Sequence, residues 1–234
     1  MRKLILAAII GFILSAIGCS VNPPESQNSD KFQALDRQVQ QFIESRRGTW
    51  RDYNVPDIDG KALYDIISQH GYKNALEIGT SSGYSGLWIS WALAKTGGNL
   101  VTIEIDKDLH DKAVANFREA GLAQYIDARL GDAHDIVPAL KGPFDFVFCD
   151  ADKEWYVNYL KAALSKIPTG GCFAAHNVTE NSKQWSGRNG NGILLHGDWG
   201  KNGDYLPFAL SIPSLKTEVL NPNGSDGLAV SYKK

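Results

Sequence analysis

Apolar residues near the N-terminal side of the chain recur at the spacing of a helix. Five of them follow this spacing: Phe32, Leu35, Val39, Phe42 and Ile43. A second stretch with helical character, GKALYDIIS, runs over residues 60–68. The pattern therefore predicts two helices ahead of the first strand.

After Tyr72 the pattern changes to short apolar runs separated by longer amphipathic segments. The runs predict five strands, at residues 74–79, 99–105, 125–131, 144–150 and 170–177. Because helical segments alternate with them, we expect an α/β fold with a doubly wound, mostly parallel sheet, which binds ligands at the carboxyl ends of its strands. A glycine-rich, aromatic stretch over residues 179–205 interrupts the alternation of strands and helices. Two last predicted strands, at residues 215–220 and 228–232, bring the number of strands in the sheet to seven.

The first nineteen residues differ in character from the rest of the chain. Two basic residues, at positions 2 and 3, precede an apolar run over residues 4–17, which is typical of a secretory signal and short for a membrane-spanning helix. The ending AIGC resembles the lipobox of bacterial lipoproteins, with Ala16 where leucine is usual. The resemblance implies lipidation of Cys19, so we expect a membrane-anchored lipoprotein of the bacterial cell envelope, on either membrane face. An ordinary signal peptide or an uncleaved anchor is the alternative.

A polar segment separates this signal peptide, residues 1–19, from the rest. Residues 20–30, SVNPPESQNSD, carry paired prolines, so we expect a flexible tether. The length of 234 residues and the 43% hydrophobic content suit one α/β domain, over residues 31–234. The 24 basic and 26 acidic residues nearly balance without a basic stripe, so we expect no nucleic-acid partner. Small-molecule chemistry is the better expectation.

The turn after the first predicted strand, LEIGTSSGYSG, carries two glycines four residues apart. Gly79 and Gly83 let the backbone turn tightly and approach a ligand. Their spacing is not the G-x-G-x-x-G pattern of dinucleotide-binding enzymes, because Ser81 stands at the position of the middle glycine. Glu77, two residues before the first glycine, suits a cationic ligand better than a diphosphate.

Acidic residues follow the next two predicted strands. Glu104, at the end of the second, is placed to accept hydrogen bonds from a ribose diol. Asp132 and Ala133, in GDAHD after the third, lie where an adenine amino group would be recognised. Each residue alone would be interpreted as a solvated strand end, but the ordered set favours a nucleoside-containing cofactor.

The fifth predicted strand, GGCFAAHNV, ends on two side chains that can bind a metal, His176 and Asn177. A turn into solvent is the alternative interpretation. If Asp150 and His176 lie level at the sheet edge, Cys149 and Cys172 are too far apart for a disulfide. We therefore expect both cysteines to be buried thiols.

Six segments, in this order and spacing, resemble the cation-dependent O-methyltransferases of the catechol and caffeoyl-CoA type. They are NVPDIDGKALYDII, ALEIGTSSGYSGLWIS, VTIEID, GDAHDIVPAL, FDFVFCDADKEWYVNYL and GGCFAAHNV. The similarity covers about residues 50–234, and the DADK run is its most specific element. The resemblance implies a Rossmann-like class I methyltransferase fold, S-adenosylmethionine (SAM) as cofactor, a small aromatic, catechol-like hydroxyl compound as substrate, and a homodimer.

The resemblance and the strand ends together define an expected cofactor site. Its residues are Val55, Glu77, Gly79, Gly83, Tyr84, Ser85, Glu104, Asp132, Ala133 and Asp150. The two glycines, with Tyr84 and Ser85, would hold the methionine part of SAM. Glu104 would take the ribose.

The resemblance also implies a divalent metal held by Asp150, His176 and Asn177. His176 stands where the family has a carboxylate, so one negative charge is lost and a hard oxygen ligand becomes a nitrogen. Magnesium prefers oxygen ligands, whereas imidazole suits manganese moderately and later transition metals better. We therefore expect magnesium or, given His176, manganese or a later transition metal; loss of metal affinity is the alternative.

The expected chemistry is the methylation of a phenolic hydroxyl. Its pKa of about 10 makes it a poor nucleophile at neutral pH, unless a metal stabilises the phenolate and a base takes the proton. Lys153, three residues past Asp150, would be that catalytic base. Trp155, Trp185 and Trp199 would wall an aromatic substrate, with plain packing as the alternative.

Three functions stay open on the sequence alone. A membrane-tethered, SAM-dependent O-methyltransferase is favoured because nearly the whole cofactor motif is intact. The second is a non-catalytic SAM- or nucleoside-binding lipoprotein with a degraded metal site, which the substitution at His176 supports. Export would place either protein where SAM is not expected, because SAM is made in the cytoplasm. An NAD-dependent oxidoreductase is least favoured, because the middle glycine is missing.

Overall fold

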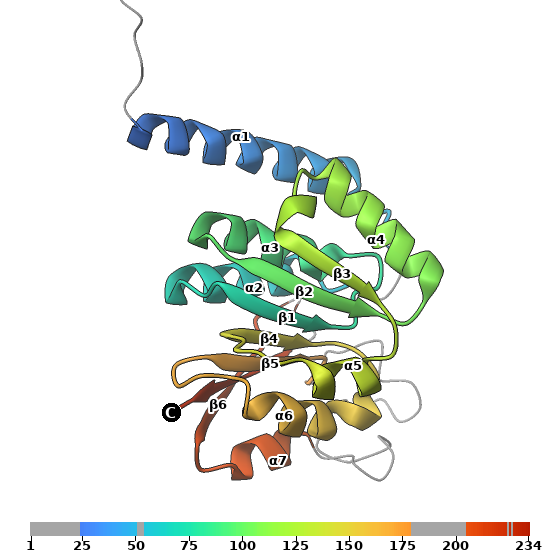
Figure 1. Ribbon diagram of the computed structural model, residues 1–234, viewed down its shortest axis with the longest axis vertical. Coiled ribbons are helices and arrows are strands. Elements are labelled where there is room, and N and C mark those ends of the chain that lie inside the picture. The colour runs from blue at the N-terminus through green and yellow to red at the C-terminus, as the bar shows by residue number, and fades with distance from the viewer. Residues whose placement is uncertain (1–23, 51–53, 179–204, 224, 226) are drawn as a thin grey trace, which may run out of the picture.

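A seven-stranded sheet runs through the computed structural model, which describes residues 24–50, 54–178, 205–223, 225 and 227–234 (Figure 1). The strands are β1 (Asn74–Ile78), β2 (Asn99–Glu104), β3 (Ile126–Leu130), β4 (Phe146–Cys149), β5 (Cys172–His176), β6 (Leu215–Leu220) and β7 (Leu228–Lys233). Their order is β3-β2-β1-β4-β5-β7-β6. Strand β7 runs antiparallel to β5 and β6, and all other neighbouring strands are parallel. The predicted seven-stranded, mostly parallel sheet is confirmed.

Helices cover both faces of the sheet. One face carries α2 (Asp57–His70), α3 (Tyr84–Thr96) and α4 (Lys107–Glu119), and the other carries α5 (Ala133–Ala139), α6 (Tyr156–Leu164) and α7 (Tyr205–Ser211). Two short 3₁₀ turns, η1 (Ala123–Tyr125) and η2 (Lys153–Trp155), precede β3 and α6. This doubly wound arrangement leaves the carboxyl ends of the parallel strands as the open edge.

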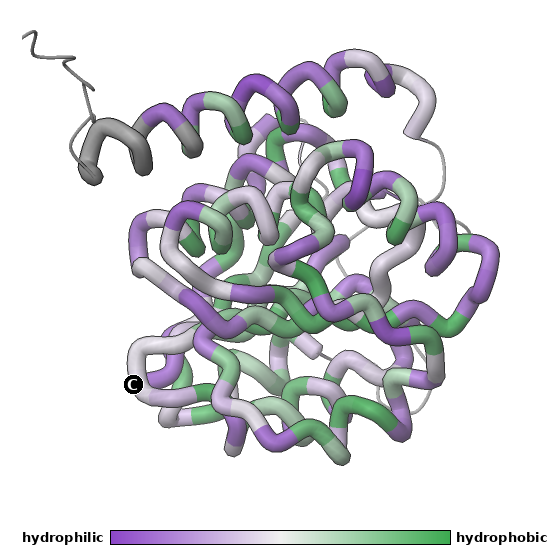
Figure 2. Tube along the Cα trace, turned by 45° about the horizontal axis from the view of Figure 1, so that its top comes forward, coloured by the Kyte–Doolittle hydropathy of each residue, from purple (hydrophilic) through white to green (hydrophobic). Residues whose placement is uncertain are grey.

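The central strands are apolar on both faces because both faces are covered. In β4, Phe146 and Phe148 join the core under α2 and α3, whereas Val147 and Cys149 join the core under α6. Burying all four side chains removes them from water, which stabilises the strand at the centre of the sheet. Figure 2 shows the apolar segments gathered in the middle of the molecule and mixed with polar ones along the outer helices.

Helix α1 (Pro24–Ser45) begins inside the segment predicted to be a flexible tether. Residues 24–30 are helical, so the tether prediction for residues 20–30 is wrong over this part. Pro24 takes the first helical position, where its fixed φ angle and missing N–H are tolerated, and residues 25–30 contain no further proline or glycine.

Helix α1 lies across one end of the molecule, next to α3 and α4 (Figure 1). Asp36 accepts hydrogen bonds from Trp91 Nε1 at 2.7 Å and Lys95 Nζ at 2.9 Å, both on α3. Arg46 pairs with Glu119 of α4 at 2.7 Å. No helix within the described ranges combines the length and apolar character that crossing a membrane requires.

The register of β4 and β5 determines which residues lie side by side at the open edge of the sheet. Cys149 pairs with Ala175, so Asp150, one residue further, lies level with His176. Cys149 and Cys172 are both buried free thiols, as predicted. Three predictions concern residues outside the described ranges: the signal sequence with Cys19, the role of Trp185 and the role of Trp199.

Candidate active site

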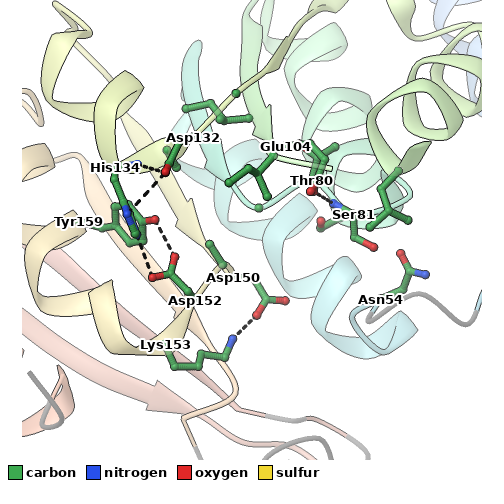
Figure 3. A pocket seen from close by; sticks show the side chains of 18 residues that line it. Asn54, Thr80, Ser81, Glu104, Asp132, His134, Asp150, Asp152, Lys153 and Tyr159 are labelled. Atoms are coloured by element: carbon green, nitrogen blue, oxygen red, sulfur yellow. Dashed lines mark hydrogen bonds and ion pairs between the residues drawn. The ribbon is translucent and has the colours of Figure 1, made fainter. Parts of the chain in front are cut away.

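A cavity of about 560 Å³ opens at the carboxyl ends of β1, β2, β3 and β4 (Figure 3). Six of the predicted cofactor residues line it: Gly79, Ser85, Glu104, Asp132, Ala133 and Asp150. Lys153 lines it as well. Residues from four separate strand ends therefore converge on one cavity, as expected for this fold.

The turn between β1 and α3 brings the backbone close to the cavity. Gly79 has a φ angle of +90°, and a Cβ atom there would lie 2.8 Å from the backbone oxygen of Asp150. Gly83 has a φ angle of +94°, and its Cβ would meet the Phe117 ring at 2.8 Å. Only glycine fits either position. Gly79 shapes the cavity wall, whereas Gly83 supports the turn from behind.

Glu104 is held by the backbone rather than by side chains. Its carboxylate accepts hydrogen bonds from the backbone N–H of Ser81 at 2.7 Å and of Asp106 at 2.9 Å. The residue is 8% exposed and lines the cavity. A carboxylate fixed in this way can still accept hydrogen bonds from a ligand on its remaining lone pairs.

Glu77 lies beneath the cavity and not on its wall. It is fully buried and accepts hydrogen bonds from Ser85 Oγ at 2.6 Å and Thr102 Oγ1 at 2.5 Å. Burial raises the pKa of Glu77 to about 7, although both hydroxyl donors oppose the shift. Because Ser85 itself lines the cavity, Glu77 reaches a ligand only through that hydroxyl.

Val55 and Tyr84 line a second, adjoining cavity of about 260 Å³. Tyr84 Oη donates to the carboxylate of Asp57, and burial with this contact raises the tyrosine pKa. Asn54 lines both cavities and accepts a hydrogen bond from Ser82 Oγ at 3.1 Å. The predicted common pocket is therefore divided at Asn54.

A polar cluster lies at the carboxyl end of β3, and the sequence predicted only some of its residues. Asp132 caps α5 by accepting from His134 N at 2.8 Å. His134 Nε2 lies 3.0 Å from Asp152, which also accepts from Tyr159 Oη at 2.7 Å. His134, Asp152 and Tyr159 line the cavity (Figure 3) but were not predicted, although two of them stand inside the GDAHD and DADK segments.

Trp155, predicted to wall an aromatic substrate, stacks on the His134 ring instead. The ring centroids are 3.7 Å apart with an interplanar angle of 18°. Trp155 does not appear among the described residues that line the cavity. Trp155 thus contacts His134, a residue that does line the cavity.

His176 is held between two carboxylates. Its Nδ1 lies 2.9 Å from Asp150 Oδ2, and its Nε2 lies 3.0 Å from Asp59 Oδ2. The side chain is 2% exposed. Burial disfavours the charged ring, but the two carboxylates outweigh it and raise the pKa of His176 to about 9. The interpretation of His176 as a turn residue facing solvent is therefore wrong.

Asp59 was missed because it comes from a distant part of the chain. It lies in the first turn of α2 and is 1% exposed, and its other oxygen accepts a hydrogen bond from Ser225 Oγ. Ser225 in turn accepts from the backbone N–H of Gly227 at 2.8 Å. The sequence offered one signal, since Asp59 stands in the NVPDIDG segment that carries the resemblance.

Lys153 completes the cluster from the start of η2. Its Nζ contacts Asp150 Oδ1 and Tyr156 Oη (Figure 3 shows the first contact). Burial disfavours ionisation of Asp150, yet Lys153 and His176 together lower the pKa of its carboxyl. Burial raises the pKa of Tyr156. Asn177, also fully buried, adopts a φ angle of +60° at the end of β5.

These residues do not fit a divalent metal. Both ring nitrogens of His176 face carboxylates, and both oxygens of Asp150 are engaged, one by His176 and one by Lys153. A metal-binding imidazole must offer an unprotonated nitrogen, and none is left. In the described part of the chain, no group of three or more His, Cys, Asp or Glu side chains is arranged to hold a metal.

Comparisons with known proteins point to one family. Residues 26–188, more than half of the chain, match the model of a family described as O-methyltransferase. A catechol O-methyltransferase of Niastella koreensis is 42% identical over 134 residues, or 56% of this chain and 60% of that protein. Caffeoyl-CoA O-methyltransferase 1 of Eucalyptus globulus is 31% identical over 137 residues, or 56% of this chain and 55% of that protein. The chain thus spans less than two thirds of the length of these curated relatives.

Solved structures agree over a larger share of the chain. The O-methyltransferase from Bacillus cereus in complex with SAH aligns with a TM-score of 0.66 at 25% identity, covering 86% of this chain and 91% of that one. TomG from Streptomyces achromogenes, involved in tomaymycin synthesis and solved with SAM, aligns with a TM-score of 0.69 at 26% identity, covering 89% and 96%. With the fold, the cavity and the family match in agreement, this chain belongs to the O-methyltransferase family.

Proposed function

We propose that this chain is a SAM-dependent O-methyltransferase that acts on the hydroxyl of a small aromatic compound. The observation that carries the proposal is the cavity, which joins the rigid carboxylate of Glu104 at one end to Lys153 and Asp150 at the other. The names of the relatives, catechol and caffeoyl-CoA O-methyltransferases, support the aromatic acceptor.

The cavity fits the cofactor in three respects. At about 560 Å³ it has the size of a cofactor site. The two backbone N–H groups on Glu104 fix its oxygens as acceptors for a ribose diol. A Cβ atom at Gly79 would meet the backbone of Asp150, so glycine there lets the ends of β1 and β4 lie close together at the cavity wall. When bound, SAM supplies an electrophilic methyl group carried on a sulfonium sulfur.

Lys153 is the proposed catalytic residue. The Lys153 ammonium first releases one proton to solvent. The neutral amine then takes the proton of the acceptor hydroxyl, and Asp150 Oδ1, in contact with Nζ, stabilises the ammonium that results. The acceptor oxygen then bonds to the methyl carbon while the carbon–sulfur bond breaks, giving a methyl ether and S-adenosylhomocysteine. Because opposite charges cancel in this step, the main tasks of the protein are alignment and exclusion of water.

The full-length protein tests the proposal through two measurements. Calorimetric titration with SAM, S-adenosylhomocysteine and NAD should show binding of the first two only. Incubation with methyl-labelled SAM and catechol should then transfer the label to catechol. Binding of SAM without transfer to any aromatic hydroxyl compound would favour the non-catalytic alternative, and binding of NAD alone would overturn the proposal.

A further inference from the structure

A line of hydrogen bonds connects four parts of the fold beneath the acceptor end of the cavity. It runs from Ser225 in the β6–β7 connection to Asp59 on α2, then to His176 on β5, and from there to Asp150 and Lys153 after β4. Every one of these residues except Asp150 is less than 9% exposed. The cluster is therefore part of the packed protein interior and does not lie on the surface.

We propose that this cluster replaces a divalent metal, so that the chain methylates its acceptor without a metal and requires only one hydroxyl group on it. The proposal rests on the proposed methyltransferase function for its second part alone. In this arrangement His176 is a positioning residue that orients Asp150, and Asp59 fixes the ring of His176.

The geometry determines the state of the imidazole ring. Carboxylates only accept hydrogen bonds, so a ring placed 2.9 Å from one and 3.0 Å from another donates from both nitrogens. A ring in that state has no lone pair for a metal and itself carries positive charge between the two acids. The imidazolium thus takes the charge-balancing role that a metal would have beside Asp150.

A metal would also have to displace existing partners. Each oxygen of Asp59 and Asp150 already contacts a protein donor: Ser225 and His176 on Asp59, and His176 and Lys153 on Asp150. Magnesium and manganese prefer several oxygen ligands. Breaking these buried contacts would leave polar groups unpaired, which costs free energy.

The consequence concerns the acceptor. A metal site favours two adjacent hydroxyl groups because both oxygens bind the ion. With Lys153 acting alone on one hydroxyl, the second hydroxyl contributes nothing to activation. The structure therefore assigns phenols in general as acceptors of the methyl group, and not vicinal diols in particular.

Metal binding by the full-length protein gives the first test, and it needs no turnover. Titration with Mn²⁺, followed by electron paramagnetic resonance, should show no saturable binding to the wild type. His176→Asp should create a saturable one-to-one site, since it places a third carboxylate beside Asp59 and Asp150. His70→Asp, the same change at an exposed histidine of α2, is the matched control and should behave as the wild type. Saturable one-to-one binding to the wild type overturns the proposal whatever the variants do.

Turnover gives the second test. EDTA should leave the wild-type rate within about twofold, and an acceptor with one hydroxyl should be methylated within about tenfold of the rate for its vicinal diol. A strict requirement for the diol, or loss of activity in EDTA that Mn²⁺ restores, overturns the proposal. Absence of turnover on both acceptors, with SAM bound, would reject the proposed function, while the Mn²⁺ titration would still decide the first part of the inference.

Discussion

Three acidic residues near the cavity are held by three different kinds of donor. Hydroxyl groups hold Glu77, backbone N–H groups hold Glu104, and the cationic side chains of His176 and Lys153 hold Asp150. Burial raises the pKa of Glu77 to about 7, whereas the cations lower that of Asp150. Residues of one chemical type are therefore held in three different ways around one cavity.

Replacing Glu104 tests the ribose assignment. Two charge-assisted hydrogen bonds to a diol are worth about 1.5 to 3 kcal/mol each, so Glu104→Ala should weaken SAM binding by at least about tenfold. Calorimetry measures the dissociation constant, and Glu218→Ala, on the exposed side of β6, serves as the control. An unchanged dissociation constant would show that the ribose lies elsewhere.

Replacing Lys153 tests the proposed base. Lys153→Ala should lower turnover roughly 100-fold while leaving the affinity for SAM nearly unchanged. Lys153→Arg keeps a charge but supplies no base at neutral pH, so it should not restore the rate. Lys161→Ala, on the exposed side of α6, is the control. Recovery of the rate in Lys153→Arg would instead assign Lys153 an electrostatic role.

The pKa of His176 predicts how stability depends on pH. The folded value of about 9 lies above the ordinary value of 6.5, so the stabilisation is complete below pH 6.5 and is lost as the pH rises to about 9. The loss should be roughly 3 kcal/mol. Glu77 acts with the same sign at lower pH, between 4.5 and about 7, because its protonated form is the one favoured by burial.

Urea unfolding between pH 7 and 9.5, a window of about 2.5 pH units, isolates the contribution of His176. The free energy of unfolding of the wild type should fall over this interval, and His176→Gln should remove most of the fall. His70→Gln, at an exposed histidine, should keep the wild-type slope. Equal slopes for the wild type and His176→Gln would mean that the ring is neutral in the folded protein.

At the scale of elements, the β1–α3 turn depends on one close approach. Gly79 and Gly97 both have positive φ angles, +90° and +78°, but only at Gly79 would a Cβ meet the backbone. Gly97→Ala should therefore cost only about 1 kcal/mol of conformational strain, and Gly79→Ala roughly 2 kcal/mol or more. Denaturant unfolding measures both. Only Gly79→Ala should also weaken SAM binding, and similar effects of the two changes would refute the steric account.

The elements themselves could largely be predicted from the sequence. Apolar runs such as FDFVFCD become buried central strands because helices cover both faces, and this makes the runs continuous and easy to recognise. The start of α1 could not be predicted, because paired prolines are compatible both with an extended segment and with a helix that begins at Pro24.

In the candidate site, only the residues at or shortly after the ends of the strands could be predicted from the sequence. Asp150 and His176 meet because the parallel register of β4 and β5 brings them level. No local pattern indicates that Asp59, which lies 117 residues before His176, packs against the same ring. The sequence therefore predicted correctly that Asp150 and His176 lie level at the sheet edge. It did not predict that Asp59 contacts the second ring nitrogen of His176.

At the scale of the whole molecule, we propose attachment to the cell envelope through Cys19. Metabolic labelling with a fatty acid should label the wild type, and Cys19→Ser should abolish the label. Cys149→Ser is the control, because this thiol is buried in β4 and should not affect lipidation. Label that persists in Cys19→Ser would exclude that residue as the attachment site.

The level alignment of positions 150 and 176 also bears on how such a site evolves. A histidine codon becomes an aspartate codon by a change of one base, and the strand backbone that presents the residue need not move. Under our inference, a single nucleotide would therefore separate a lineage that depends on environmental metal supply from one that does not. Within one unchanged fold, dependence on a metal would be a trait that descendants can gain or lose in a single mutational event.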